Sequence, residues 1–149
     1  MFVRALFAAL GIAGLMAATP ADTAVIVNSG STNSYGYTIH VASDGKASFT
    51  LQRGESAATT PKPFTVPAAT AARFFSDLAA ARKGNAAAEP CMKSASFGTS
   101  MHVTWQGWVS PDLSCPTNDG SGDALVRDIS AIRQAGGIPE MPLHSATGP

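Results

Sequence analysis

Charge is scarce in this 149-residue chain, and its scarcity excludes several classes of function. Only 13% of the residues are charged, with ten basic and ten acidic side chains. Domains that bind nucleic acid or anionic membrane surfaces need a basic face, and a chain without a positive excess does not offer one. We therefore expect no nucleic-acid partner.

Sequence motifs for cofactors and metals are also lacking. The chain has no glycine-rich dinucleotide or phosphate-binding motif. The loop over residues 118–123 is rich in oxygen atoms but lacks the alternating ligands and terminal glutamate of a calcium-binding EF-hand. We predict no cofactor and no metal-binding or cofactor-binding residue.

The N-terminus has the pattern of a secretory signal peptide. Arg4 precedes an apolar run over residues 5–18, followed by small residues and Pro20. The run is shorter than the roughly 20 residues that a membrane-spanning helix needs. We predict a signal peptide over residues 1–21, cleaved between residues 18 and 24. The mature protein would be exported to the periplasm or the medium, with no stable membrane insertion.

The mature chain would be nearly neutral and suits a single domain. Without Arg4 it keeps nine basic and ten acidic residues, a net charge of −1. Its length is enough for one hydrophobic core and too short for two. We predict one domain over residues 22–137. Residues 138–149 contain three prolines and no hydrophobic period, so we predict a loose tail.

Cysteine occurs only twice, at Cys91 and Cys115. An oxidising compartment usually converts such a pair into a disulfide. The bond would close a loop of about 25 residues and stabilise the fold by roughly 3 kcal/mol. A reactive or metal-binding thiol pair is the alternative, but the CxxC spacing and neighbouring histidines are missing. The predicted loop also contains both tryptophans, Trp105 and Trp108.

Alternation of apolar and polar residues predicts the first part of a sheet. We expect a strand over residues 24–29 and a hairpin over residues 37–52. A three-residue turn with Gly45 in the left-handed conformation would place Val41 opposite Ala47, so that the apolar side chains share one face. The next stretch, residues 54–65, contains two prolines and is predicted to be a loop.

Two helices and a second hairpin are predicted in the remaining chain. Pro67 would take the first position of a helix over residues 67–83. Its apolar stripe would comprise Ala71, Phe74, Phe75, Leu78 and Arg82. The second hairpin would turn at Gln106 and Gly107: a two-residue turn pairs Trp105 with Trp108, and a three-residue turn pairs Val103 with Val109 instead. The second helix would be capped by Ser121 or Asp123 and end before Gly136.

The order of these elements is strand, hairpin, helix, hairpin, helix. It predicts the α+β class, with an antiparallel sheet of about five strands and two helices packed on one face.

The chain contains histidines and serines, which are residue types that a hydrolase uses, but it lacks the sequence motif of a serine nucleophile. The histidines are His40, His102 and His144, and no serine lies in a nucleophile elbow. If the strands of His40 and His102 were neighbours, the two rings could approach each other, but two ligands alone do not make a zinc site. We predict no catalytic residue, and keep a small hydrolase that uses His102 and a serine as an alternative.

Several segments resemble a loosely defined group of small exported bacterial domains of unknown function. The resemblance rests on YTIHVASDGKASFTL, ARFFSDLAAAR, CMKSASFGTS and WQGWVSPDLSCP. It implies export and an α+β fold, and it assigns no activity.

A shorter match is similar to the subtilisin-inhibitor family of secreted protease inhibitors. It comprises the helix segment over residues 75–81, CMKS at residues 91–94, residues 103–107 and Cys115. The resemblance implies that Met92 or Lys93 would enter the pocket of a serine protease, held by the disulfide. The chain lacks the second disulfide of that family.

The sequence thus predicts an exported, non-catalytic domain that binds an unidentified protein or cell-envelope component. The candidate interaction surface comprises Met92, Lys93, Trp105 and Trp108, because a loop that carries aromatic and methionine side chains is typical of an interface anchor. A serine-protease inhibitor with its reactive segment at Met92 and Lys93 is the alternative of a different class.

Overall fold

The computed structural model describes residues 21–53, 56, 58–93 and 98–139. In this part of the chain the elements are β1 (Thr23–Asn28), β2 (Gly36–Ala42), β3 (Lys46–Gln52), β4 (Lys62–Thr65), α1 (Ala68–Gly84), β5 (Met101–Trp105), β6 (Trp108–Val109) and α2 (Ser121–Ala135). All but the last residue of the predicted signal peptide lies outside the described residues.

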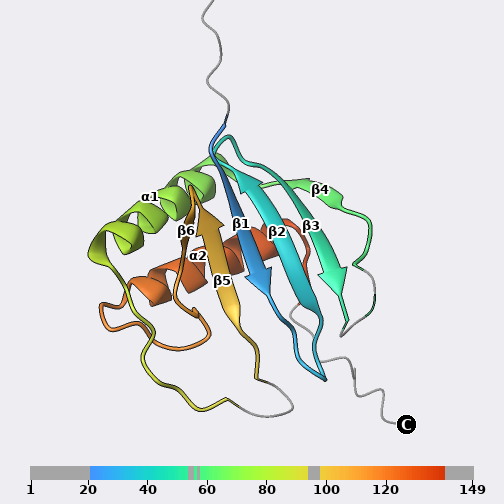
Figure 1. Cartoon of the computed structure of the whole chain (residues 1–149). Helices are drawn as coiled ribbons and strands as arrows, with labels where there is room; N and C mark the ends of the chain where they lie inside the picture. The colour runs from blue at the N-terminus through green and yellow to red at the C-terminus, as the bar shows by residue number, and fades with distance from the viewer. Residues whose placement is uncertain (1–20, 54–55, 57, 94–97, 140–149) are drawn as a thin grey trace, which may run out of the picture.

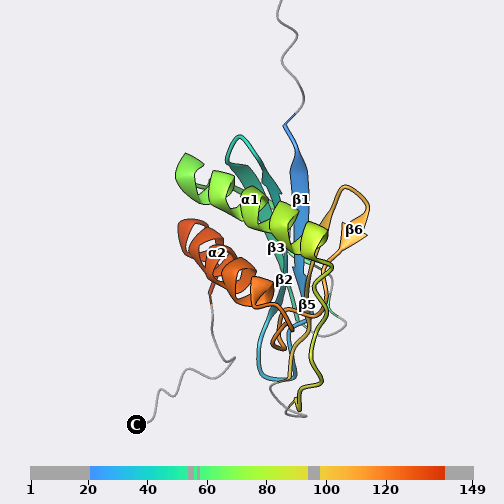
Figure 2. The same cartoon turned by 90° about the vertical axis from the view of Figure 1, so that its left-hand side faces the viewer.

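The strands form one antiparallel sheet in the order β4-β3-β2-β1-β5-β6, so that β1 lies inside the sheet between β2 and β5. The two helices pack against each other and cover one face of the sheet (Figure 1, Figure 2). The predicted α+β class is confirmed, with six described strands in place of about five. Neither described helix is long and apolar enough to cross a membrane.

The core lies between the sheet and the helices because alternate side chains of each strand point to that side. Ile26 of β1 pairs with Ile39 of β2 and with Val103 of β5, and all three are fully buried. The helices cover this row with Phe74, Leu78, Leu125, Ile129 and Ile132. Burial of each such side chain contributes about 1.5–3 kcal/mol.

The first hairpin has the register that its hydrophobic pattern predicts. Val41 pairs with Ala47, and Ile39 pairs with Phe49. Gly45 has a φ of 86°, and its N–H donates to the carbonyl of Ala42. The predicted three-residue turn is therefore confirmed.

The second hairpin adopts the two-residue turn. Trp105 pairs with Trp108, and both Gln106 and Gly107 have positive φ, at 48° and 76°. Positive φ at both central residues is the type I′ geometry, whose twist matches that of the flanking strands. The two tryptophans consequently lie on one face of the hairpin, on the side of the core.

The predicted loop over residues 54–65 was wrong at its end, where residues 62–65 form β4. Pro63 pairs with Ser48 of β3. Proline lacks an N–H, but on an edge strand that group can point away from the sheet. The proline-containing stretch therefore includes an edge strand as well as a loop.

The N-terminal caps of both helices differ from the predictions, whereas α2 ends before Gly136 as predicted. Pro67 precedes α1 as its N-cap, and Gly120, not Ser121 or Asp123, is the N-cap of α2. The hydroxyl of Thr117 accepts from the N–H of Gly122, so a residue before the helix satisfies its first turn.

Two further side chains depart from their predicted positions. Arg82 lies outside the buried face of α1, which comprises Ala71, Phe74, Leu78 and Ala81. Ile138, assigned to the tail, is buried in the core, while residues 140–149 lie outside the described residues.

The turn glycines offer a matched pair of substitutions. An added Cβ at Gly45 would lie 2.6 Å from the carbonyl oxygen of Val66, whereas at Gly107 it would meet no atom within 4 Å. We expect Gly107→Ala to lower the free energy of unfolding by about 1–2 kcal/mol through backbone strain alone. Gly45→Ala should cost about 1–3 kcal/mol more because of the clash. Urea denaturation of both variants checks this, and equal losses would contradict the described contact.

Candidate functional site

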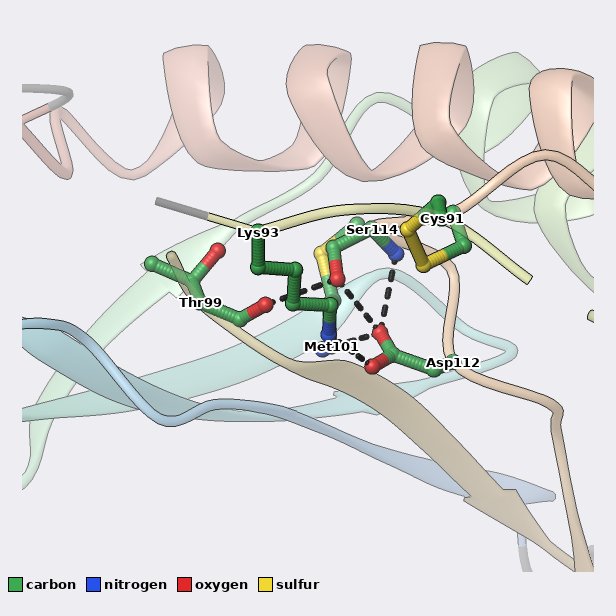
Figure 3. The surroundings of a disulfide bond; sticks show 7 residues. Cys91, Lys93, Thr99, Met101, Asp112 and Ser114 are labelled. Carbon is green, nitrogen blue, oxygen red and sulfur yellow. Dashed lines mark hydrogen bonds and ion pairs between the residues drawn. A yellow bond between two sulfur atoms is a disulfide. The ribbon is translucent and has the colours of Figure 1, made fainter. Parts of the chain in front are cut away.

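A disulfide between Cys91 and Cys115 joins the chain after α1 to the chain before α2 (Figure 3). The two Cα atoms are 5.7 Å apart. Next to the disulfide, Asn118 donates its backbone N–H to the carbonyl of Ala87, and Glu89 donates to that of Pro116. The predicted pairing is confirmed, and it lies beside backbone hydrogen bonds that hold the same two segments together.

Residues 91–93 form what we call the Met92 segment. The side chain of Met92 is fully exposed, with a relative accessibility of 102%. Cys91 is held by the disulfide, and the ammonium group of Lys93 forms an ion pair with the carboxylate of Asp112. An apolar side chain is thus presented to solvent between two attached neighbours.

Asp112 holds together three parts of this region. One carboxylate oxygen accepts from the Lys93 ammonium group, and the other accepts the backbone N–H of Met101 at 3.0 Å (Figure 3). The second oxygen also accepts the N–H of Ser114 at 3.0 Å. A carboxylate has about four lone-pair positions, so one side chain can serve all these donors.

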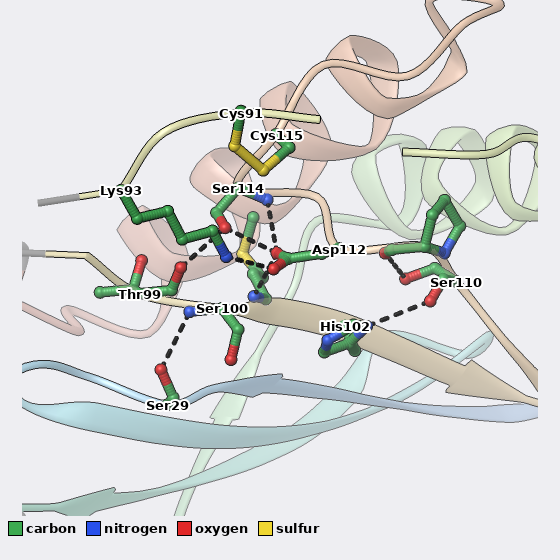
Figure 4. Close-up of polar contacts among 12 residues, drawn as sticks. Ser29, Cys91, Lys93, Thr99, Ser100, His102, Ser110, Asp112, Ser114 and Cys115 are labelled. Carbon is green, nitrogen blue, oxygen red and sulfur yellow. Dashed lines mark hydrogen bonds and ion pairs between the residues drawn. A yellow bond between two sulfur atoms is a disulfide. The ribbon is translucent and has the colours of Figure 1, made fainter. Parts of the chain in front are cut away.

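The start of β5 is attached to the same region (Figure 4). The hydroxyl of Ser114 lies 2.8 Å from the carbonyl oxygen of Thr99, and the backbone N–H of Leu113 donates to the carbonyl of Met101. The N–H of Ser100 donates to the hydroxyl of Ser29, which follows β1. The Met92 segment is therefore connected through Asp112 and Ser114 to the sheet itself.

The hydrogen bonds of Asp112 decide its charge. Burial by itself raises the pKa of this carboxyl group. The hydrogen bonds from Lys93, Ser114 and the N–H of Met101 outweigh burial and hold the pKa well below its usual range. Asp112 is consequently ionised, and its pair with Lys93 persists, throughout the neutral pH range.

The two tryptophans lie at the other end of β5. Trp105 is nearly buried and contacts the ring of Phe75, with centroids 6.1 Å apart, while Trp108 is partly buried. Trp105 lies four positions after Met101 along the strand, a distance of about 13 Å. The structure thus brings Met92 and Lys93 together and places Trp105 and Trp108 elsewhere, at the margin of the core.

Polar contacts fix the position of Trp105. Its indole N–H donates to the carboxylate of Asp22 at 2.8 Å, and the amide of Gln106 donates to the same oxygen at 2.9 Å. The guanidinium carbon of Arg82 lies 5.8 Å from the centroid of the Trp105 ring. Asp22 falls within the predicted cleavage range of residues 18–24, so cleavage after it would remove these contacts.

The histidines are not assembled into a site. His40 on β2 and His102 on β5 are separated by β1. His102 Nδ1 lies 3.1 Å from the carbonyl oxygen of Ser110, and no described carboxylate forms an ion pair with it. The hydroxyl of Ser110 donates to the carbonyl of Pro111 (Figure 4). His144 lies outside the described residues.

The described residues offer little support for a metal site or a small-ligand pocket. Among the described residues, no group of three His, Cys, Asp or Glu side chains could hold a metal ion. A surface hollow of about 610 Å³ is lined by Ser29, Ser31, Thr32, Arg53 and Ser56. The described part of this lining lacks the apolar and aromatic side chains that predominate in pockets for small ligands.

Comparisons with protein-family models, with curated proteins and with solved structures found no match for this chain. Both resemblances therefore remain predictions.

Sequence reasoning missed Asp112, the residue on which the site depends. Its local signal is an aspartate two residues before Ser114, a spacing typical of a turn closed by the aspartate side chain. Its contacts with Lys93 and Met101 span 19 and 11 residues, and only the folded chain reveals them.

Replacement of Asp112 tests the arrangement. We expect Asp112→Asn to lower the free energy of unfolding at neutral pH by about 1–3 kcal/mol, because the Lys93 ion pair is lost. The folded pKa of Asp112 lies below the ordinary value of 3.8, so its stabilisation is present above that pH and is lost as the pH falls below it.

Denaturation at several pH values measures both effects. The wild-type protein should lose stability below about pH 4 more steeply than the variant does. Asp123→Asn, at an exposed position in the first turn of α2, is the control. Parallel curves for wild type and Asp112→Asn would show that Asp112 does not hold this region.

Proposed function

We propose that this protein is an exported, non-catalytic domain that binds a protein or cell-envelope component through the Met92 segment. One observation carries the proposal: Met92 is fully exposed, while its two neighbours are held by a disulfide and by an ion pair. An exposed apolar side chain on a fixed backbone suits recognition of another molecule.

The attachment of the segment supports binding on entropic grounds. A loop that is ordered before it meets its partner loses less conformational entropy on association. The methionine side chain has three rotatable bonds and a polarisable sulfur, so it adapts to apolar pockets of different shapes. A fixed backbone with one adaptable apolar side chain is therefore an effective anchor.

Export is supported by the signal-peptide pattern and by the disulfide. Structural disulfides form and persist mainly in oxidising compartments. Because Cys91 is exposed, a reducing cytosol would give thiols access to the bond.

A photo-crosslinking amino acid at position 92 tests the proposal. We expect it to capture a specific partner from the cell envelope when the disulfide is intact. The matched control carries the same group at Val126, an exposed apolar residue of α2. Capture at position 92 should fall at least tenfold after reduction of the disulfide. The same capture from position 126, or capture unchanged by reduction, would contradict a role for the Met92 segment.

A second candidate is a serine-protease inhibitor with its reactive segment at Met92 and Lys93. The observation that favours it is that Lys93 is held in an ion pair whereas Met92 is fully exposed. The ammonium group of Lys93 is held by Asp112, whereas Met92 is free to enter a pocket. The inhibitor would therefore act on proteases with an apolar specificity pocket, such as subtilisin-like enzymes, and not on trypsin-like ones. The described hydrogen-bonding contact of His102 is with the carbonyl oxygen of Ser110, which does not favour the hydrolase alternative.

Titration of the oxidised protein against both kinds of protease tests this candidate. We expect nanomolar inhibition of a subtilisin-like enzyme, lost by at least a hundredfold in Met92→Asp because a charge would enter the apolar pocket. Lys93→Gln is the matched control and should keep most of the inhibition. Absence of inhibition would eliminate the inhibitor and leave the binding domain to the crosslinking experiment.

A further inference from the structure

A buried carboxyl group lies where α1 and α2 pack together, apart from the Met92 segment. The side chain of Asp128 on α2 is 1% exposed. One of its oxygens accepts from the guanidinium Nε of Arg73 on α1. The other oxygen is buried and has no hydrogen-bond partner among the described residues. Such an oxygen is rare and destabilising in a folded protein, so it requires an explanation.

A second carboxyl group supplies that explanation. Asp77 lies one helical turn after Arg73 on α1 and within hydrogen-bonding reach of Asp128. Two ionised carboxylates repel each other and have no donor between them. If Asp128 carries a proton, its O–H can donate to Asp77, and the unpartnered oxygen is satisfied.

We propose that Asp77 and Asp128 share one proton, and that this proton holds α1 against α2 in a pH-dependent way. The pair then carries one negative charge, which Arg73 balances. Arg73, Asp77 and Asp128 form a neutral cluster at the contact between the helices.

Among the described residues, Arg73 alone neutralises the single negative charge of the Asp77–Asp128 pair, and no other charged side chain takes part. Arg73 and Asp77 are the charged groups of α1 that act on Asp128. The residues three and four positions away on α2 are uncharged: Ala124, Leu125, Ala131 and Ile132. The strands beneath the helices contribute apolar side chains to the core.

The sign of the pH dependence follows from the surroundings of Asp128. Burial raises its pKa, the Arg73 guanidinium lowers it, and the Asp77 carboxyl group raises it again, so that the pKa lies above the ordinary 3.8. Stabilisation by the proton is therefore fully present below pH 3.8 and is lost as the pH rises through the raised value. This is opposite in sign to the contribution of Asp112.

Carbon-13 NMR of aspartate-labelled protein tests the shared proton directly. We expect the carboxyl carbons of Asp77 and Asp128 to report one retained proton at a pH where the exposed aspartates are ionised, and to shift together when it is lost. Ionisation of both groups together with the exposed aspartates would overturn the proposal.

Variants test its effect on the fold. In Asp128→Asn the amide can donate to Asp77 while its oxygen still accepts from Arg73, so the variant mimics the protonated acid. As the pH rises from about 4 to about 8, the urea concentration at the denaturation midpoint of the wild type should decrease. The midpoint of Asp128→Asn should stay constant over the same range. In Asp77→Asn the side-chain amide at position 77 can donate to Asp128. This variant should therefore also show no decrease of the denaturation midpoint with rising pH.

Asp123→Asn, at an exposed site on α2, is the control and should follow the wild type. Parallel curves for the wild type and both cluster variants would overturn the proposal. If Asp128→Asn does not fold, Asp77→Asn and the NMR titration still decide the matter.

Discussion

The Met92 segment and the start of β5 depend on the hydrogen bonds and the ion pair that the Asp112 carboxylate forms. This carboxylate joins Lys93 after α1, the first residue of β5 and Ser114 before α2, three places that the sheet alone does not connect. The disulfide ties the same segments covalently. A charge-assisted hydrogen bond is roughly twice as strong as a neutral one, so a single ionised side chain can order a region that has little apolar surface to bury.

The two ends of β5 therefore have different roles. At the Trp105 end, ring contacts and the hydrogen bond to Asp22 complete the core. At the Met101 end, the strand is attached to the segment that exposes Met92. The backbone on both sides of an apolar side chain in solvent is thus held by the fold, which supports the proposed role in recognition. The neutral cluster around Asp128 stabilises the helical layer independently of this site.

Much of the fold could be predicted from local pattern, and the site could be predicted only in part. The period of two predicted the first hairpin to the residue, because a register shift would have exposed Ile39 and Phe49. The edge strand β4 was missed because proline is typical of loops, and Pro63 was therefore assigned to a loop together with the residues around it. Met92 and the disulfide were predicted from the loop that contains them. The structure places Trp105 at the other end of β5, because the extended strand carries that residue away from the region around Met101.

The central claim is that the Met92 segment is ordered before it meets any partner. Nitrogen-15 relaxation of the oxidised protein measures this directly at the amides of Met92 and Lys93. The account predicts order parameters near those of rigid backbone, about 0.85, falling below about 0.6 when the disulfide is reduced and Asp112 is replaced. Order parameters below about 0.6 in the intact protein would contradict the claim, because the exposed methionine would then lie on a segment that nothing holds.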